Sequence, residues 1–255
     1  VNNVLARMFL ERAKQTLPYF LGAKPGQVMG KQGTKTIKWR RVEQLTPSTS
    51  ALAELTGEAS YMQGRSASAA SVTDLTATLA KYGQFYIINE EVDLFDPAGT
   101  IGELTGTLGE AAGRSLNQLQ RNEMEDNSTQ RFAGNVASVG LVLAAPVVGD
   151  VDRIIVELNT NSALPFMPMT TGSRDIGTAP VLASVWAICH PHVAYDYSKL
   201  TGFKSVETYA GQVRTAPGEF GYYAGAGRGV RFIQSEDASI DTGAGASGAG
   251  SADRK

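Results

Sequence analysis

The stretch "TIGELTGTLGEAAGRSLNQLQRNEMED", residues 100–126, has apolar residues that recur every three or four positions. This spacing predicts one amphipathic helix through the whole stretch. At 1.5 Å per residue, such a helix would be about 40 Å long. The apolar positions are Ile101, Leu104, Leu108, Ala112, Leu116 and Leu119.

Four glycines interrupt this predicted helix, although each costs about 1 kcal/mol relative to alanine in a helix interior. Their presence favours the close approach of another backbone over simple helix propensity. We therefore expect a second segment to pack tightly along the helix. The glycines are Gly102, Gly106, Gly109 and Gly113.

The sequence before this helix predicts a shorter helix and then a hairpin. Residues 3–17 have apolar residues at helical spacing and are followed by Pro18, which stops a helix. "TKTIKWRRVEQL" (34–45) alternates as a strand with one strongly basic face. Residues 46–71 are small and polar and predict an exposed excursion. Residues 72–95 return as one or two strands, so that the two arms could pair as an extended hairpin.

The second half of the chain predicts a compact unit of alternating helices and strands. A helix capped near Asp150 should point Ile154, Ile155 and Leu158 inward and end at Pro165. "PVLASVWAICH" (180–190) is continuously apolar, as in a strand buried on both faces. The elements that complete the predicted α+β fold are a short helix with Pro191 in its first turn and Gly202 just past its end, a final strand in "GVRFIQSEDA" (229–238) and a flexible Gly/Ala/Ser segment at 241–255.

Composition excludes several classes of protein. A hydrophobic share of 42% is too high for a disordered chain, and a net charge of −2 gives no global attraction to nucleic acid. The single cysteine cannot form an internal disulfide, which fits a reducing cytoplasm. Because no apolar run approaches 20 residues, no membrane span is expected.

The cluster of Cys189, His190 and His192 is the most obvious candidate for a metal site. Zinc sites need three or four ligands at suitable spacing, and no second half of such a site is present. If the histidines lie in a helix, residues two apart point about 200° apart, so the imidazoles should diverge. We expect a helix start or a core role for this cluster and no metal. Because these are the only histidines, nothing marks a Ser-His-Asp triad.

Two glycine-rich stretches resemble nucleotide-binding loops but lack the required spacing. "GQVMGKQG" (26–33) has three residues, where four are needed, between glycine and Gly-Lys, and Gln32 follows Lys31. "GAGRG" (225–229) precedes a predicted strand, whereas a dinucleotide fingerprint follows one. A glycine-rich turn explains the second stretch better. We expect no cofactor.

Charged residues supply the remaining candidates. Glu91 and Asp93 would share a face of a strand and could form a carboxylate pair, although an ion-pairing face is the commoner outcome. Lys38 and Arg40 share a face beside Trp39 and could touch phosphates, but seven residues of a nearly neutral chain make a weak case for nucleic-acid binding. No catalytic residue is indicated, and we do not expect an enzyme.

Five blocks of sequence, taken in order, resemble the major capsid proteins of tailed bacteriophages, and most closely those of the coliphage N-four-like group. The similarity runs with gaps from about Leu10 to Ala238. The blocks are "KTIKWRRVEQLTPSTSALAELTG", "VTDLTATLAKYGQF" with "NEEVDL", "GEAAGRSLNQLQRNEMEDN", "CHPHVAYD" and "GVRFIQSEDA".

The resemblance implies the shell fold shared by tailed phages and herpesviruses. It assigns 1–33 to an N-terminal arm, 34–95 to an extended loop with flanking strands, 96–149 to a peripheral domain with a long spine helix, and 150–240 to an axial domain. The arm and loop would embrace neighbouring subunits. In that setting the intersubunit contact candidates are Lys38, Arg40 and Arg41 on the basic strand and Glu90, Glu91 and Asp93 as an acidic face.

The function that the resemblance implies is a structural one. Copies would assemble as pentamers and hexamers into an icosahedral shell around double-stranded phage DNA, contacted weakly and without sequence specificity. Portal, scaffolding or decoration proteins are the other expected partners, and the location is the virion, assembled in the host bacterial cytoplasm. The alternative is an encapsulin-like nanocompartment shell that encloses an enzyme cargo.

Two features depart from the family pattern. Family members continue past the axial domain with a strand that returns to the peripheral domain, so we expect the chain to be incomplete on its C-terminal side. Some members of the wider fold join subunits covalently through a lysine on the extended loop, but no lysine lies between Arg41 and Ala80. Subunits are therefore expected to be held by non-covalent contacts.

Overall fold

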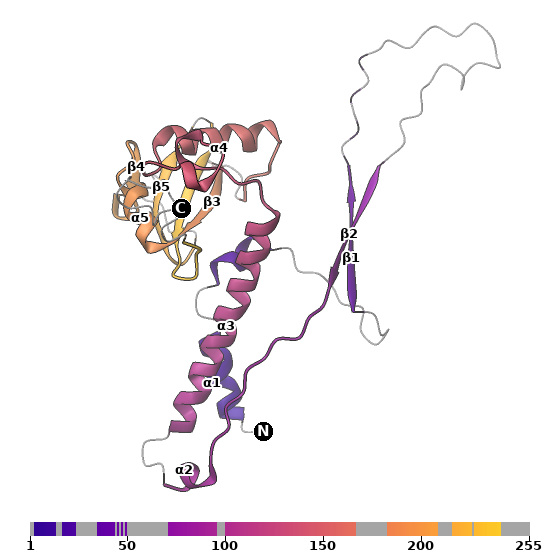
Figure 1. Ribbon diagram of the computed structural model, residues 1–255, viewed down its shortest axis with the longest axis vertical. Helices are drawn as coiled ribbons and strands as arrows, with labels where there is room; N and C mark the ends of the chain where they lie inside the picture. The colour runs from indigo at the N-terminus through magenta and orange to yellow at the C-terminus, as the bar shows by residue number, and fades with distance from the viewer. Residues whose placement is uncertain are drawn as a thin grey trace, which may run out of the picture. The chain divides into compact units, whose positions relative to one another are not determined.

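The computed structural model describes residues 3–13, 17–23, 35–43, 45, 47, 49, 71–95, 100–166, 183–208, 216–225 and 227–240. The chain divides into two units, one of Lys24–Gly83 and one of Val1–Ala23 with Gln84–Lys255. Helices and strands are mixed, as expected for an α+β protein. Figure 1 labels the elements.

The long helix predicted from residues 100–126 is confirmed as α3, Thr100–Asn127. A second helix, α1 (Asn3–Ala13), runs alongside it (Figure 1). Of the helix predicted at residues 3–17, the structure describes Asn3–Ala13; residues 14–16 lie outside the described part, and Leu17 is not helical. A 3-10 helix, η1 (Pro18–Gly22), follows, and its Pro18 and Tyr19 are buried.

Two of the four glycines in α3 explain how closely α1 approaches. A Cβ added at Gly109 would lie 2.5 Å from the carbonyl oxygen of Phe9, and one at Gly113 would lie 2.6 Å from that of Ala13. Both distances are too short for any side chain. Because each pair advances by four residues in the same direction, the helices run parallel. The expected tight backbone contact is confirmed here.

The smaller unit contains the predicted hairpin. Strands β1 (Thr36–Val42) and β2 (Val72–Thr78) pair antiparallel, with Thr36 opposite Thr78 and Val42 opposite Val72. Most of the polar excursion predicted at 46–71 lies outside the described residues. The hairpin has an apolar face that contains Ile37 and Trp39 of β1 and their partners Ala77 and Leu75 of β2.

The further strand allowed for in residues 79–95 is not present. Residues 79–89 have no regular secondary structure, and helix α2 (Glu90–Phe95) follows them. The Asn89 side chain accepts a hydrogen bond from the backbone N–H of Glu90, the first residue of this helix (3.0 Å). The prediction that Glu91 and Asp93 share a strand face is therefore wrong.

The compact part of the larger unit is a four-stranded sheet in the order β3-β6-β5-β4. β3 and β6 are parallel, and the other neighbours are antiparallel. The strands are β3 (Ser184–Cys189), β4 (Phe203–Ser205), β5 (Glu219–Ala224) and β6 (Gly229–Gln234); the helices are α4 (Val148–Thr160) and α5 (Pro191–Ser198), with short 3-10 turns η3 (Ala133–Asn135), η4 (Val139–Leu141) and η5 (Val206–Thr208).

The main hydrophobic core lies between α4 and the sheet. Val151 and Ile155 of α4 pack with Val230 and Phe232 of β6. Ile155 is inward as predicted, but Ile154 is 44% exposed, because one helical step turns the next side chain about 100° away. The helix ends at Thr160, before Pro165.

The strand predicted to be buried on both faces lies at the edge of the described sheet. In β3 only Ser184 and Cys189 are buried, and the four residues between them are half-buried. The fully covered strand is β6, which has neighbours on both sides and whose first five residues are all buried. A continuous apolar run indicated a strand here but did not give its place in the sheet. The helix led by Pro191 and the strand at Gly229 are confirmed.

Candidate assembly surfaces and the polar joint

The three basic candidates on β1 are exposed, and the two arginines among them have acidic partners within the smaller unit. Arg40 Nε lies 3.2 Å from Asp74 Oδ1, and Arg41 Nη2 lies 2.6 Å from Glu43 Oε1. The hydrogen bond from Arg41 holds the pKa of Glu43 below its usual value. Lys38 is exposed on the same strand. Exposed pairs of this kind contribute about 0.2–1 kcal/mol, so these side chains could exchange partners at little cost.

The acidic candidates lie in α2, and the described side chains among them are exposed. Glu90 and Glu91 are the first two residues of this helix, and Asp93 is the fourth. Positions two apart in a helix do not share a face, so the strand geometry on which the predicted pair of Glu91 and Asp93 rested is absent. The expected contact between these residues and the basic strand of a neighbouring copy stays a prediction.

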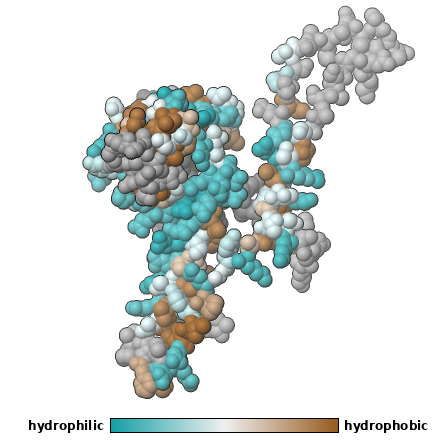
Figure 2. Space-filling model, in the orientation of Figure 1, coloured by the Kyte–Doolittle hydropathy of each residue, from teal (hydrophilic) through white to brown (hydrophobic). Residues whose placement is uncertain are grey.

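The most unusual surface of the chain begins where β2 ends. We call residues 79–95 the apolar segment. Every side chain described in it is exposed; Phe85 and Ile87, for instance, are 80% and 88% exposed. Figure 2 shows hydrophobic residues at the surface along the hairpin strands as well. The large exposed hydrophobic residues of the segment are Leu79, Tyr82, Phe85, Tyr86, Ile87, Ile88, Leu94 and Phe95.

Water-exposed apolar side chains in such density are rare in monomeric proteins and mark interaction sites. Burial of one large apolar side chain contributes about 1.5–3 kcal/mol, so covering even part of the apolar segment would stabilise a complex substantially. From the sequence, this segment was predicted to be part of one or two strands of an extended hairpin. Its exposure became visible only in the structure.

The Cys189 cluster is a structural joint, as expected. Burial raises the pKa of the Cys189 thiol to about 12, so it is protonated at neutral pH. Its Sγ lies 3.7 Å from the Ile233 carbonyl oxygen, to which it can donate a hydrogen bond. His190 caps α5, because its Nδ1 accepts a hydrogen bond from the backbone N–H of His192 (3.3 Å).

The predicted divergence of the two imidazoles is wrong. The rings of His190 and His192 stack with centroids 5.1 Å apart and planes 9° from parallel. The prediction assumed that both residues are helical, whereas His190 has an extended backbone and precedes the helix. In the part of the chain that the structure describes, no three His, Cys, Asp or Glu side chains form a metal-binding group.

The two glycine-rich stretches that resemble nucleotide-binding loops differ in what the structure describes. Residues 26–33 lie outside the described part of the chain. "GAGRG" connects β5 to β6, and its Gly227 has a φ of 81°, a left-handed conformation that favours glycine. The prediction of a glycine-rich turn before a strand is confirmed.

A groove of about 430 Å³ lies between residues 130–146 and α4. Its two arginines have acidic partners: Arg131 contacts Glu157 at 2.6 Å and Arg153 contacts Asp150 at 3.4 Å. Hydrogen bonding to Arg131 holds the pKa of Glu157 below its usual value. With its cations paired in this way, the groove offers little attraction to an anionic ligand.

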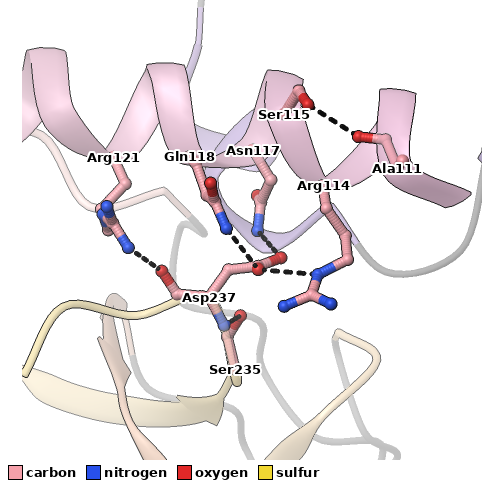
Figure 3. Close-up of polar contacts among 8 residues, drawn as sticks. All are labelled: Ala111, Arg114, Ser115, Asn117, Gln118, Arg121, Ser235 and Asp237. Carbon is pink, nitrogen blue, oxygen red and sulfur yellow. Dashed lines mark hydrogen bonds and ion pairs between the residues drawn. The ribbon is translucent and has the colours of Figure 1, made fainter. Parts of the chain in front are cut away.

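Asp237, just after β6, is the centre of a polar joint with α3 (Figure 3). Its Oδ2 accepts a hydrogen bond from Asn117 Nδ2 (3.0 Å), and its Oδ1 accepts from Gln118 Nε2 and Arg114 Nε (3.2 Å each). Its backbone carbonyl accepts from Arg121 Nη1 at 2.6 Å. Four side chains of one helix therefore hold a single residue.

Asn117 extends this joint to the N-terminal segment. It is 0% exposed, and its Oδ1 accepts a hydrogen bond from the Tyr19 backbone N–H (3.3 Å). Burial, reinforced by Glu125, raises the pKa of Tyr19 to about 12. We call Tyr19, Asn117, Asp237 and the α3 side chains that bind Asp237 the polar joint. Residues about 100 positions apart meet in it, and sequence reasoning missed it.

The pKa of Asp237 reflects two opposing effects. Burial acts to raise it, but the hydrogen bonds from Asn117, Gln118 and Arg114 outweigh burial and hold the pKa below its usual value. The carboxylate is therefore ionised at neutral pH, and all three donors depend on it. The only signal in the sequence was a pair of amides, Asn117 and Gln118, between two leucines of the apolar stripe.

The sequence was compared with protein-family models and with curated proteins. No family model matches the sequence, and no curated protein matches it significantly. Among the helices that the structure describes, none combines the length and the apolar character needed to cross a bilayer.

Proposed function

We propose that this chain is a major capsid protein whose copies assemble into an icosahedral shell around double-stranded phage DNA. The observation that carries the proposal is the apolar segment, residues 79–95, whose described side chains are all exposed. A chain that assembles with many copies of itself can cover such a surface at every subunit, because symmetry repeats each contact.

The hairpin supports the same proposal. An isolated two-stranded hairpin is marginally stable in water unless its apolar face packs against something. The face formed by Ile37, Trp39, Leu75 and Ala77 is only half-buried or exposed. A neighbouring copy would provide the missing surface, which is the role that the resemblance gives to an extended loop.

Charge also fits a shell protein. The basic strand with Lys38, Arg40 and Arg41 and the acidic residues Glu90, Glu91 and Asp93 have opposite signs, so they suit contacts between copies. A net charge of −2 avoids strong adhesion of packaged DNA to the shell. In this proposal the chain has no catalytic role or cofactor, and its other partners are a portal and scaffolding or decoration proteins.

Electron microscopy of purified native material, combined with nuclease treatment, tests the proposal. We expect closed icosahedral particles in which double-stranded DNA resists added nuclease until the particles are opened. Closed particles that hold a protein cargo and no DNA would replace the capsid proposal with a nanocompartment. Dispersed single chains in the native material would contradict both.

A further inference from the structure

Among the described residues of the larger unit, no hydrophobic cluster joins the helical part to the sheet, and polar contacts connect the two. The two hydrophobic clusters among the described residues draw their members from residues 148–232. Neither cluster includes a residue of α1, η1 or α3. What links α3 to the sheet in the described residues is the polar joint at Asp237.

The segment that connects α3 to α4, residues 128–147, has little regular secondary structure. Residues 128–147 contain only the short turns η3 and η4 among their described elements, and none of these residues is buried. Such a connection can follow a change in orientation without losing a packed core. The polar joint is therefore the feature that can hold α3 and the sheet in one arrangement.

We propose that the polar joint is a conformational latch that fixes the orientation of α3 relative to the sheet, and that Asp237 is its positioning residue. Hydrogen bonds are directional, so a carboxylate bound by three donors accepts one arrangement and disfavours its neighbours. Loss of this one side chain removes three bonds together and leaves buried Asn117 without its acceptor. The latch does not depend on whether the chain forms a shell.

The position of Asn117 explains how the latch also includes the N-terminal segment. Its amide group donates to Asp237 and accepts from Tyr19, so one buried side chain contacts η1 and the segment after β6 together. α1 is fixed to α3 by the glycine contacts. The helical part should therefore move as one body when the latch opens.

Distance measurement between two spin labels tests this inference. One label is placed at Ser115→Cys on α3 and the other at Lys204→Cys on β4, two exposed positions, in the full chain carrying Cys189→Ala. Labelled chain is diluted into unlabelled chain, so that only distances within one chain are recorded even if copies assemble. We expect a single narrow distance distribution with the latch intact.

Asp237→Ala should broaden this distribution at least twofold in width, while circular dichroism shows the same helix and strand content. Asp126→Ala, which removes an exposed aspartate at the end of the same helix, is the matched control and should leave the width unchanged. Asp237→Asn keeps the shape but loses the charge and one acceptor, and should give an intermediate width.

An unchanged distribution in Asp237→Ala would overturn the latch. If Asp237→Ala does not fold, the Asp237→Asn variant decides in the same way, and a distribution identical to that of the parent chain counts against the proposal. A failure here leaves the proposed shell function untouched, because the measurement concerns one chain alone.

Discussion

The sheet of the larger unit and the stretch from β2 to α2 differ in where their stability comes from. β6 has five consecutive buried residues and a neighbouring strand on each side, so its side chains are covered and its backbone is hydrogen-bonded within the chain. Every described side chain from residue 71 to residue 95 is exposed. The sheet is buried like the core of a domain, whereas the stretch from β2 to α2 has large apolar residues that no described part of the chain covers. Burial within the chain therefore accounts for the sheet, whereas our proposal assigns the cover of the exposed stretch to a neighbouring copy.

The largest effect should come from charging the apolar segment. Ile87→Asp places a carboxylate in a surface that we expect to be covered by another copy, where an unpaired charge is strongly disfavoured. Assembly should be lost, so that sedimentation shows small species where the parent chain gives large particles. Because Ile87 is 88% exposed in the single chain, the fold itself should be unaffected.

Gln84→Asp is the matched control for this change. It adds the same charge in the same exposed stretch without removing an apolar side chain. We expect it to assemble far better than Ile87→Asp. Equal loss of assembly in both variants would show that charge alone matters, and normal assembly of Ile87→Asp would remove the apolar segment from the interface.

A second effect concerns the close contact of α1 with α3. Gly109→Ala places a methyl group 2.5 Å from the Phe9 carbonyl oxygen and should lower the free energy of unfolding by about 2–3 kcal/mol. Gly102→Ala places one at an ordinary distance of 3.9 Å from Met8 Cε and should raise the free energy of unfolding by about 0.5–1 kcal/mol. Denaturant unfolding of both variants measures the two changes, and equal effects would contradict the parallel helix contact.

The polar joint should make stability depend on pH in the acid range. The pKa of Asp237 is lowered in the folded chain from its usual 3.8. The stabilisation is therefore complete above that value and is lost as the pH falls below it, through the folded pKa. Other charged groups that line or influence the joint, Glu110, Arg114, Arg121 and Glu236, remain in the variant that follows.

Asp237→Asn isolates this contribution. It should lower the free energy of unfolding at pH 7 by about 1.5–3 kcal/mol, the range for hydrogen bonds to charged groups, and by less at pH 3. Denaturant unfolding at the two pH values measures it. A difference between variant and parent that is the same at both pH values would show that the carboxylate is not held by the joint.

The smallest effect should come from the hairpin ion pairs. Arg40→Ala removes an exposed pair with Asp74 and should change the free energy of unfolding by less than about 1 kcal/mol. If Arg40 instead contacts a neighbouring copy, Arg40→Ala should weaken assembly at raised salt by more than a change of about 1 kcal/mol would explain. Salt-dependent sedimentation of Arg40→Ala beside Arg7→Ala, an exposed arginine of α1, separates the two cases.

Much of the fold could be predicted because its signals are local. The periodicity of residues 100–126 and the costly glycines within it gave both α3 and the tight contact along it. Pro191 marked the start of the helix at 191–198, whereas Gly202, predicted just past its end, lies four residues after Ser198. In each case, the residues that decide the structure lie within a few turns of one another.

The errors came from features that depend on distant partners. Residues 79–95 were assigned to strands from their apolar and aromatic residues, and an asparagine followed by two glutamates, Asn89 to Glu91, was overlooked as the start of a helix. In the polar joint, Asn117 contacts Asp237, which lies 120 positions later in the sequence, and no local pattern predicts such a contact. The edge position of β3 depends likewise on which strand pairs with it.

The most direct test of the central claim is a residue-level electron microscopy map of the native particle. We expect a closed shell in which Phe85 and Ile87 of each copy lie against a neighbouring copy and are shielded from solvent. A shell in which these side chains stay in water, or native material that consists of single chains, would contradict it.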